Sequence, residues 1–436
     1  MSVKTGFRFD AALVADEWID DVVITVANGL IESIQPYAVG DSLDATGIQG
    51  VALPGMTNVH SHAFQRGLAG LSEYRTANRD SFWTWRNLMY DFLAHLEPPE
   101  VYRLAKQLYR EMLRAGYTSV GEFHYLHNDK NGLPYSDPTE FSVAVTQAAL
   151  DVGINFCLIP TLYQCGGFAR PLEQKQQRFF LTEDDFHELL RRCQHLFQTQ
   201  PNFQIGMALH SLRAVEVSVG QRVVRQFRND FSDRPIHMHV SEQLGEVDDC
   251  LAATGRRPVE LLFDHFDVDD RWCLIHATHA QSQELKLIAN SQAVVGLCPS
   301  TEGNLGDGIF AAAEFLELGG RWGIGTDSQI AINPAAELRL LEYGQRLSKR
   351  LRCVLGTQSR SVGRNLFERV AAYGAQALGI NAGEIAVGRR ADLIVIDPTH
   401  PSIDGAARDR LLDRFVFCDF GNPVSRTMVG GVWADV

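Results

Sequence analysis

The stretch LPGMTNVHSHAF, residues 53–64, decides how the chain folds and where its chemistry lies. It begins as an apolar run and ends in two histidines, His60 and His62, that are one residue apart. Side chains at positions i and i+2 of a strand point to the same side, so both imidazoles can hold one metal ion together. The alternative for an isolated pair is two polar residues on a solvated strand face. The rest of the chain decides between these interpretations.

Apolar runs alternate with longer amphipathic stretches through the middle of the chain, a pattern typical of repeated strand–helix units around a parallel sheet. The runs are VALPGMTNVHSH (51–62), TSVGEFHY (118–125), INFCLIPTLY (154–163), FQIGMALHS (203–211), PIHMHVSE (235–242), WCLIHATH (272–279), AVVGLCPS (293–300) and RWGIGTDS (321–328). Eight such strands are the number that closes a (β/α)8 TIM barrel. We therefore predict an α/β protein with a (β/α)8 barrel over residues 54–370.

Both ends of the chain indicate short antiparallel strands. Strand-like runs flank the pair Asn28-Gly29 near the N-terminus, and Gly430-Gly431 interrupts another strand-like run near the C-terminus. Both pairs suit the tight turns of hairpins, because they tolerate positive φ. We expect a small β-sandwich-like domain built from both termini, residues 1–53 and 371–436.

Composition excludes several classes of partner. The formal net charge is −13, from 53 acidic and 40 basic residues. A nucleic acid or an anionic membrane would call for a basic face, so neither is expected as a partner. No apolar run approaches the length of a membrane span, and acidic residues stand where a signal peptide would be apolar, so we expect a cytoplasmic protein. The eight cysteines form no CxxC pair and are expected to be reduced thiols.

Polar residues gather at the carboxyl ends of the predicted strands. They are His60 and His62 on the first strand, Glu122 and Tyr125 on the second, His210 on the fourth, His239 and Glu242 on the fifth, His276 on the sixth and Asp327 on the eighth. In a barrel these ends meet at one mouth, where the active sites of this fold lie. One cluster of histidines and carboxylates favours a metal centre over a set of solvated side chains.

Four of these residues have the chemistry of zinc ligands. His60, His62 and His239 supply nitrogens and Asp327 supplies a carboxylate, which leaves one position of a Zn²⁺ ion open. We expect one ion per subunit, with another divalent transition metal as the alternative. His237 lies two residues before His239 and is expected deeper in the barrel.

The alternative role for Asp327 is to cap the helix that follows. Gly323 and Gly325 come just before it and let the backbone crowd the barrel mouth, which favours the ligand role.

Two further residues are expected to handle protons. Glu242 follows His239 by three residues, and a carboxylic acid beside the metal can take a proton from water and pass it to a departing nitrogen. The alternative for Glu242 is a surface carboxylate in the first turn of a helix. His276 is better used as a donor or orienting base beside the bound water than as a fifth ligand. The predicted catalytic residues are thus Glu242, His276 and Asp327.

Three features near the predicted mouth are given minor roles. Trp83 and Trp85 are expected either as a lid over the site or as packing anchors. His124 and His127 are expected to lie behind the site or at the surface. Gly303, Gly306 and Gly308 predict a flexible rim, because no phosphate-binding signature follows them.

Together these residues resemble the amidohydrolase superfamily: HxH on the first strand, histidines on the fifth and sixth, aspartate on the eighth, and a small sheet domain from both termini. The resemblance covers nearly the whole chain. INFCLIPTLY and FQIGMALHS contain no lysine or glutamate of the kind that bridges two metals in that superfamily, so the resemblance implies a mononuclear site. HVSE and GTDS are similar to the deaminase branch, in which the glutamate shuttles protons.

Longer segments are similar to members of the superfamily that release ammonia from a linear amidine; they are HSHAFQRGLAGLSEYR, FWTWRNLMY, GEFHYLHND, LHSLRAV and CPSTEGNLGDGIF. The resemblance implies a small-molecule substrate with two carboxylates, for which bidentate arginine is the best partner. The substrate-binding residues that it implies are Gln65, Arg86, Tyr125, His210 and Arg213. A homodimer is expected because similar proteins are commonly dimers.

Two alternatives stay open. A deaminase of guanine, cytosine or an aminated triazine would keep the fold and metal, but its flat neutral substrate would call for aromatic stacking and amide hydrogen bonds in place of two arginines. A catalytically inactive barrel used as a binding module would be marked by a lost ligand, and none of the four is missing from the sequence.

Overall fold

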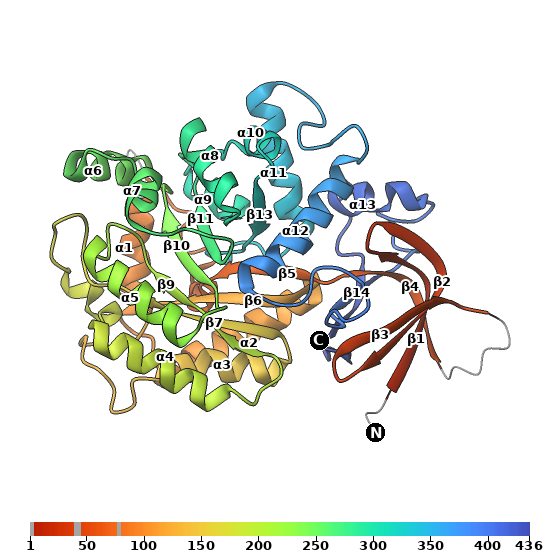
Figure 1. Cartoon of the computed structure of the whole chain (residues 1–436), viewed down its shortest axis with the longest axis horizontal. Helices are drawn as coiled ribbons and strands as arrows, with labels where there is room; N and C mark the ends of the chain where they lie inside the picture. Colours follow the sequence, from red (N-terminus) through yellow and green to blue (C-terminus); the bar gives the residue numbers. More distant parts are fainter. Residues whose placement is uncertain (1–3, 39–44, 76–79) are drawn as a thin grey trace.

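The computed structural model describes residues 4–38, 45–75 and 80–436. A barrel of parallel strands surrounded by helices lies beside a mixed sheet that contains the N-terminal strands (Figure 1).

The barrel is closed, as the sequence predicts. Its strands are β5 (Met56–Ser61), β6 (Tyr117–His124), β7 (Asn155–Leu162), β8 (Phe203–Ile205) with β9 (Met207–Leu209), β10 (Ile236–Val240), β11 (Trp272–His276), β12 (Val294–Leu297) and β13 (Arg321–Ile324). All neighbours pair in parallel, and the pair Ile324–Asn58 joins β13 back to β5. Gly206 divides the fourth strand into β8 and β9, so nine segments make eight strands.

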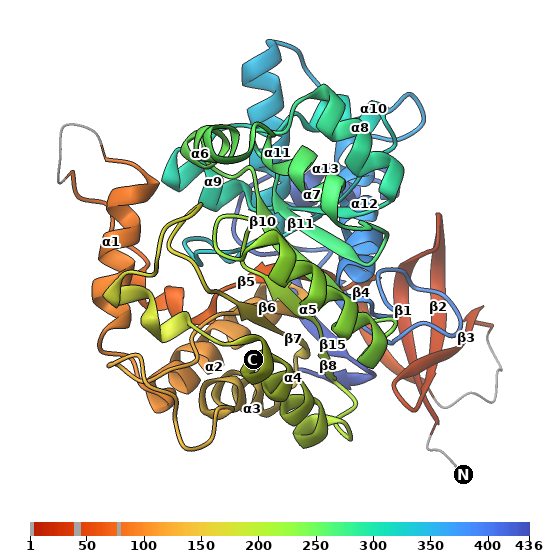
Figure 2. The same ribbon diagram turned by 60° about the vertical axis from the view of Figure 1, so that its left-hand side comes forward.

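The helices surround the barrel (Figure 2). They are α1 (Phe82–Leu93), α2 (Pro98–Ala115), α3 (Glu140–Val152), α4 (Glu183–Phe197), α5 (Val217–Asp230), α6 (Leu244–Thr254), α7 (Pro258–His265), α8 (Ser282–Ser291), α9 (Pro299–Leu305), α10 (Ala312–Glu317), α11 (Pro334–Lys349), α12 (Val362–Leu378) and α13 (Arg408–Phe417), with short 3-10 helices η1 (Ala63–Leu68) and η2 (Gln174–Phe179).

Helix α2 illustrates how local sequence fixes these elements. It begins at Pro98, whose fixed φ suits the first turn, and Gly116 ends it in the left-handed region at φ 100°. Between these ends, Val101, Leu104 and Leu108 repeat at helical spacing and are buried. The helix therefore presents one apolar face to the barrel and one polar face to solvent.

The second sheet is built from both termini, as predicted, and its seven strands belong to one mixed sheet in the order β16-β15-β14-β4-β1-β2-β3. The strands are β1 (Lys4–Val14), β2 (Glu17–Ala27), β3 (Leu30–Pro36), β4 (Ala45–Pro54), β14 (Leu393–Ile396), β15 (Val424–Val429) and β16 (Val432–Trp433). Asn28 and Gly29 both have positive φ between β2 and β3, and Gly430 and Gly431 do so between β15 and β16, which confirms both predicted hairpins.

The two sheets are joined directly along the chain. Strand β4 of the terminal sheet continues through Gly55 into β5 of the barrel, and the Gly55 amide donates to the Asp392 carbonyl of the terminal sheet (2.9 Å). Helix α12 packs on β5, β12 and β13 of the barrel. The predicted boundary at residue 370 falls within α12, and the division into two domains stays a prediction.

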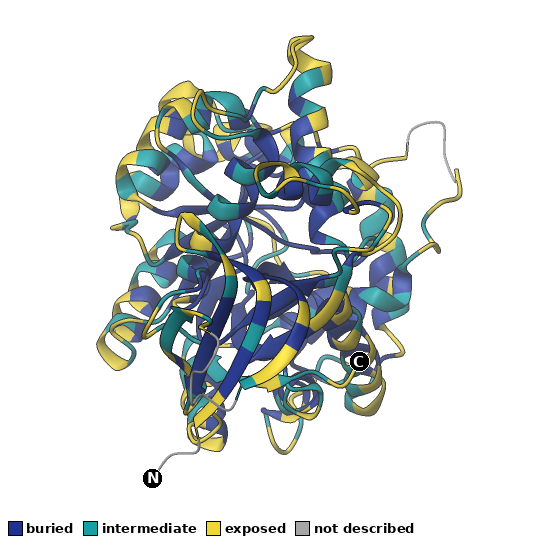
Figure 3. Ribbon diagram, turned by 90° about the vertical axis from the view of Figure 1, so that its right-hand side faces the viewer, coloured by how far each residue is buried: buried dark blue, intermediate teal, exposed yellow. Residues whose placement is uncertain are grey.

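Burial follows this arrangement (Figure 3). The barrel strands are buried throughout most of their length, whereas exposed residues lie on the outer faces of the helices and at the edge of the terminal sheet. All eight cysteines are free thiols, as predicted, although Cys353 and Cys418 are exposed. Among the described residues, no helix combines the length and apolar character needed to cross a membrane.

Gly363 offers a test of how tightly α12 packs on α13. A Cβ at this position would lie 2.5 Å from the Leu412 carbonyl oxygen and 2.6 Å from the Asp413 backbone. Because these neighbours are backbone atoms, we expect Gly363→Ala to destabilise the fold by about 1–3 kcal/mol, the usual cost of overpacking. Urea unfolding measures the change. Gly47→Ala is the matched control, since a Cβ there meets nothing within 4 Å; equal midpoints for the two variants would contradict the assignment.

Candidate active site

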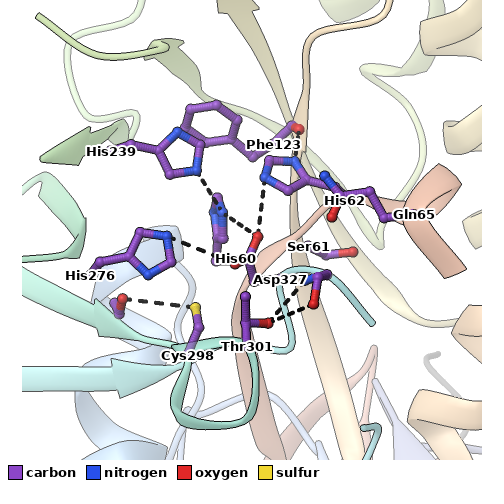
Figure 4. Close-up of polar contacts among 12 residues, drawn as sticks. His60, Ser61, His62, Gln65, Phe123, His239, His276, Cys298, Thr301 and Asp327 are labelled. Atoms are coloured by element: carbon purple, nitrogen blue, oxygen red, sulfur yellow. Dashed lines mark hydrogen bonds and ion pairs between the residues drawn. The ribbon is translucent and has the colours of Figure 1, made fainter. Parts of the chain in front are cut away.

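The four predicted metal ligands meet at the mouth of the barrel (Figure 4). His60 lies on β5 and His62 directly follows that strand, whereas His239 lies on β10 and Asp327 in the turn after β13. Their ligand atoms all lie within 4.8 Å of one another, and all four residues are buried. The Nε2 atoms of His60 and His62 are each 3.3 Å from Oδ1 of Asp327. The structure therefore brings the predicted ligands together, and their role as ligands remains a proposal.

Hydrogen bonds outside the cluster orient two of the imidazoles. Nδ1 of His62 donates to the Phe123 carbonyl (2.8 Å), and Nδ1 of His239 donates to the His210 carbonyl (3.1 Å). Because a carbonyl only accepts, each ring carries its proton on Nδ1 and turns the Nε2 lone pair toward the cluster. Neighbouring carbonyls orient metal-binding histidines in this way.

The protonation states also fit a cation. Burial lowers the pKa of His60 to about 3, and it lowers the pKa of His62 and of His239 as well, so all three rings are neutral. Burial alone would raise the pKa of Asp327, but the hydrogen bond with His60 and the nearby histidines hold it below its usual range. Neutral imidazoles and a carboxylate are the forms that bind a metal.

The shortest contact within the cluster also indicates a place for a cation. Nε2 of His60 and Nε2 of His239 lie only 3.0 Å apart. Because Nε2 of His239 turns a lone pair toward His60, this contact is favourable only with a proton or a cation between the two nitrogens. The residues present therefore fit a divalent metal ion.

Backbone geometry at the strand ends is strained in a way typical of functional sites. His276 has φ 68° and Asp327 has φ 45°, in the left-handed region that non-glycine residues rarely adopt. Gly325 permits the close approach that the sequence suggested, because a Cβ there would lie 2.8 Å from the Cβ of His60 and 2.9 Å from its carbonyl oxygen. This glycine lets the turn after β13 place Asp327 against His60 and His62.

Glu242 and His276 lie beside the cluster. Nε2 of His276 is 3.8 Å from Oε1 of Glu242 and 3.8 Å from Oδ2 of Asp327. Burial raises the pKa of Glu242 to about 7. Burial opposes protonation of His276, yet the carboxylates of Glu242, Glu302 and Asp327 raise its pKa to about 10. A buried carboxyl group near neutrality is suited to both taking and giving a proton.

The predicted substrate-binding residues line one cavity in front of these groups. The cavity encloses about 540 Å³ of empty space including its open mouth, and its walls contain Gln65, Arg86, Tyr125, His210 and Arg213 together with His62, His239, Glu242, His276 and Asp327. Nε2 of Gln65 donates to the Tyr125 hydroxyl (3.1 Å), so these two residues are held together. The roles of these five residues in substrate binding stay predictions.

Both arginines keep donors free for a ligand. Nε of Arg86 and Nε of Arg213 are buried and have no hydrogen-bond partner among the described residues. The guanidinium of Arg86 lies over the Trp83 ring, 4.6 Å from its centroid, and Nη1 of Arg213 donates to the Ser211 hydroxyl (3.3 Å). Buried donors without a partner are costly, so a substrate carboxylate would stabilise this arrangement.

Some sequence predictions near the mouth require correction. Of the two positions expected for His124 and His127, the surface position is wrong, because both are buried and neither lines the cavity. The segment predicted as a rim is only partly a loop: Gly303 lies within α9, Gly306 caps the end of this helix, and Gly308 lies in the loop that follows. His237 lies deeper in the barrel, as predicted, with Nε2 donating to the Ala377 carbonyl (2.9 Å).

The sequence analysis missed three residues that belong to this region. Tyr163 lines the cavity directly after β7, and the rule that strand ends meet at the mouth would have found it. Tyr90 lines the cavity one helical turn after Arg86, a spacing that predicts a shared helix face. Glu302 bonds Nδ1 of His276 (3.2 Å), but in the sequence it is only an acid near a helix start.

Comparison with known proteins identifies the class. The signature of the Amidohydrolase family matches residues 51–434, so this chain belongs to the amidohydrolase family, a class of typically metal-dependent hydrolases. Among its relatives, the formimidoylglutamate deiminase of Pseudomonas aeruginosa is 45% identical over 427 residues, which cover 97% of this chain and 93% of the relative.

Two further comparisons agree with the family. A crystal structure of an amidohydrolase from Brucella melitensis has 40% identity and a TM-score of 0.93, and the match covers 98% of this chain and 94% of that one. The 5-methylthioadenosine/S-adenosylhomocysteine deaminase of Natronomonas pharaonis is 25% identical over 94% of this chain and 87% of its own length.

Metal removal tests the cluster directly. We expect chelation of the purified protein to lower its melting temperature, because the converging lone pairs and the Asp327 carboxylate lose their common partner. Elemental analysis before chelation should give one divalent ion per chain. His62→Ala should reduce that metal content severely, whereas His195→Ala should not, since His195 is exposed on α4. Full metal content in His62→Ala would contradict the ligand assignment.

Proposed function

We propose that this chain hydrolyses N-formimino-L-glutamate to N-formyl-L-glutamate and ammonia, a step of histidine degradation. The observation that carries the proposal is that one cavity contains the histidine–aspartate cluster together with two arginines whose Nε atoms have no partner among the described residues. A substrate with two carboxylates and a hydrolysable C–N group matches this cavity, because the arginines suit the carboxylates and the cluster suits the C–N group. The 45% identity to a formimidoylglutamate deiminase supports the same substrate.

The metal in this proposal is one Zn²⁺ ion per chain, held by His60, His62, His239 and Asp327. Three nitrogens and one carboxylate are a ligand set that zinc accepts. When bound, the ion supplies Lewis acidity that lowers the pKa of a coordinated water.

Glu242 moves the proton in the proposed reaction. Its carboxylate takes a proton from the attacking water and, as a carboxylic acid, gives one to the imino nitrogen, which leaves as ammonia. A new C–O bond to the amidine carbon forms and the C–N bond to the imino nitrogen breaks. The burial that raises the pKa of Glu242 to about 7 makes both transfers accessible near neutrality.

His276 acts as the second polar group at the reacting carbon. Its Nδ1 is bonded to Oε1 of Glu302 (3.2 Å), which also accepts from the Cys298 amide (2.9 Å). This contact fixes the ring so that Nε2 points toward Glu242 and Asp327. From there Nε2 donates to the oxygen that develops charge as the C–O bond forms.

The remaining predicted residues hold the substrate. Arg86 and Arg213 bind its carboxylates, since planar guanidinium groups match carboxylates in geometry and charge. Gln65, Tyr125 and His210 complete the pocket as hydrogen-bond partners. The predicted homodimer, the cytoplasmic location and the absence of nucleic-acid and membrane partners accompany this proposal as predictions from the sequence.

Turnover of a substrate panel tests the proposed function. We expect purified protein to release one ammonia and one N-formylglutamate per formiminoglutamate, and to act far more slowly on guanine, cytosine and 5-methylthioadenosine. Measuring formamide and glutamate in the same samples checks which C–N bond breaks. Faster turnover of a heterocycle, or formamide as the product, would overturn the proposal.

Glu242→Gln tests the proton carrier. The amide keeps the size of the side chain but cannot exchange a proton, so we expect kcat to fall by about 10²–10⁴-fold, the range for loss of general acid–base catalysis. Metal content should stay at the wild-type value, because Glu242 is not among the four ligands. Glu140→Gln on the exposed start of α3 is the control. Wild-type kcat in Glu242→Gln would remove this role.

A further inference from the structure

Two cavity tyrosines share one buried partner. Nε2 of Gln176, on η2, donates to the hydroxyl of Tyr163 (2.9 Å) and to the hydroxyl of Tyr90 (3.2 Å). Oε1 of Gln176 accepts from the Glu173 amide (2.8 Å), so the amide group can face the phenols only with its NH₂ end. Gln176 is fully buried and both tyrosines are nearly so, which holds the three side chains in this arrangement.

The orientation of the amide decides where the phenol protons go. Each phenol oxygen accepts a hydrogen bond from Gln176, so neither phenol can donate to that residue. A hydrogen bond between the two hydroxyls is the other way to use a phenol proton within this group of three side chains. Such a bond uses one phenol proton out of two, and at least one O–H therefore remains to be donated into the cavity that both residues line.

Two positively charged side chains line the same cavity as the tyrosine pair. Tyr90 lies one helical turn after Arg86 on α1, and the Arg86 guanidinium is 5.5 Å from the centroid of the Tyr90 ring. The charges of Arg213 and Arg86 both act on the Tyr163 phenol. The Tyr163 ring also packs edge-on against His210, with centroids 4.6 Å apart. A free O–H donor and two guanidinium groups thus face one region of the cavity.

We propose that Tyr90 and Tyr163, with their protons directed by Gln176, form together with Arg86 and Arg213 the binding site for one of the two substrate carboxylates. This inference rests on the proposed function and deepens it. A carboxylate accepts up to four hydrogen bonds, so it satisfies the phenol donor and the guanidinium donors at once. A neutral heterocycle offers fewer acceptor positions and no negative charge to pair with the two guanidinium groups, so part of these donors would stay buried without partners. The tyrosine pair is therefore a determinant of specificity for carboxylate substrates.

Tyr163→Phe removes the hydroxyl and keeps the ring. Because a hydrogen bond to a charged group is lost, we expect KM for formiminoglutamate to rise about tenfold or more, with kcat nearly unchanged. Tyr90→Phe should act in the same direction and serves as the second variant if the first does not fold. Gln176→Met leaves both hydroxyls but no longer directs their protons, so it should raise KM as well. Metal content should match the wild type in all three variants.

Two analogues separate a carboxylate contact from general damage to the cavity. N-formimino-4-aminobutyrate lacks the α-carboxylate, and N-formimino-L-norvaline lacks the side-chain carboxylate. Measured as competitors of turnover, one of them should bind Tyr163→Phe as tightly as it binds the wild type, because it lacks the carboxylate that the phenol contacts. The other should bind the variant about tenfold or more weakly.

Tyr102→Phe is the matched control, since this tyrosine bonds Asp151 at the surface of α2. An unchanged KM in both cavity variants, or equal weakening of both analogues, would overturn the inference. These outcomes are distinct from failure of the proposed function, in which the wild type itself releases no ammonia from formiminoglutamate.

Discussion

The structure depends on bringing three neutral imidazole nitrogens and one carboxylate oxygen within 4.8 Å of one another at a buried place. Burial keeps the histidines unprotonated and therefore able to bind a cation, but it also removes the water that would otherwise satisfy their lone pairs. A common cation would satisfy these lone pairs and the Asp327 carboxylate at once. The neighbouring features serve this arrangement: carbonyls orient two rings, Gly325 allows close approach, and Asp327 adopts a strained φ to complete the cluster.

The cavity in front of this cluster is lined by two kinds of polar group in different places. Near the cluster, Glu242 and His276 are close enough to share a proton-transfer role, and their environment brings the pKa of Glu242 to about 7. Elsewhere in the wall, Arg86 and Arg213 supply positive charge, and Gln176 directs phenol donors into the same space. A small anionic amidine fits this distribution, because its reacting carbon needs groups that transfer protons and its carboxylates need positively charged donors.

Much of the fold could be predicted from the sequence, because strands and tight turns leave local patterns in it. The count of eight apolar runs and the two glycine-containing turn pairs predicted the barrel and both hairpins, since strand periodicity and positive φ are local properties. The same local reasoning was wrong for Gly303, where packing of α9 on α11 favours a helix over a flexible loop. It also allowed a surface position for His124 and His127, whose burial is set by the helices that cover β6 and the segment after it.

By itself, the sequence determined the type and order of the strands and which polar residues end them, because those features follow from residue spacing along one segment. It therefore named the candidate site residues, such as His60, Glu242 and Arg213, only as a list of side chains. Tertiary structure alone decided which histidine nitrogens face the cluster and which arginine Nε atoms lack a partner among the described residues. It also decided that Gln176 on η2 bonds both Tyr90 of α1 and Tyr163 after β7. These are contacts between segments far apart in the chain, and their geometry is fixed only when the barrel closes.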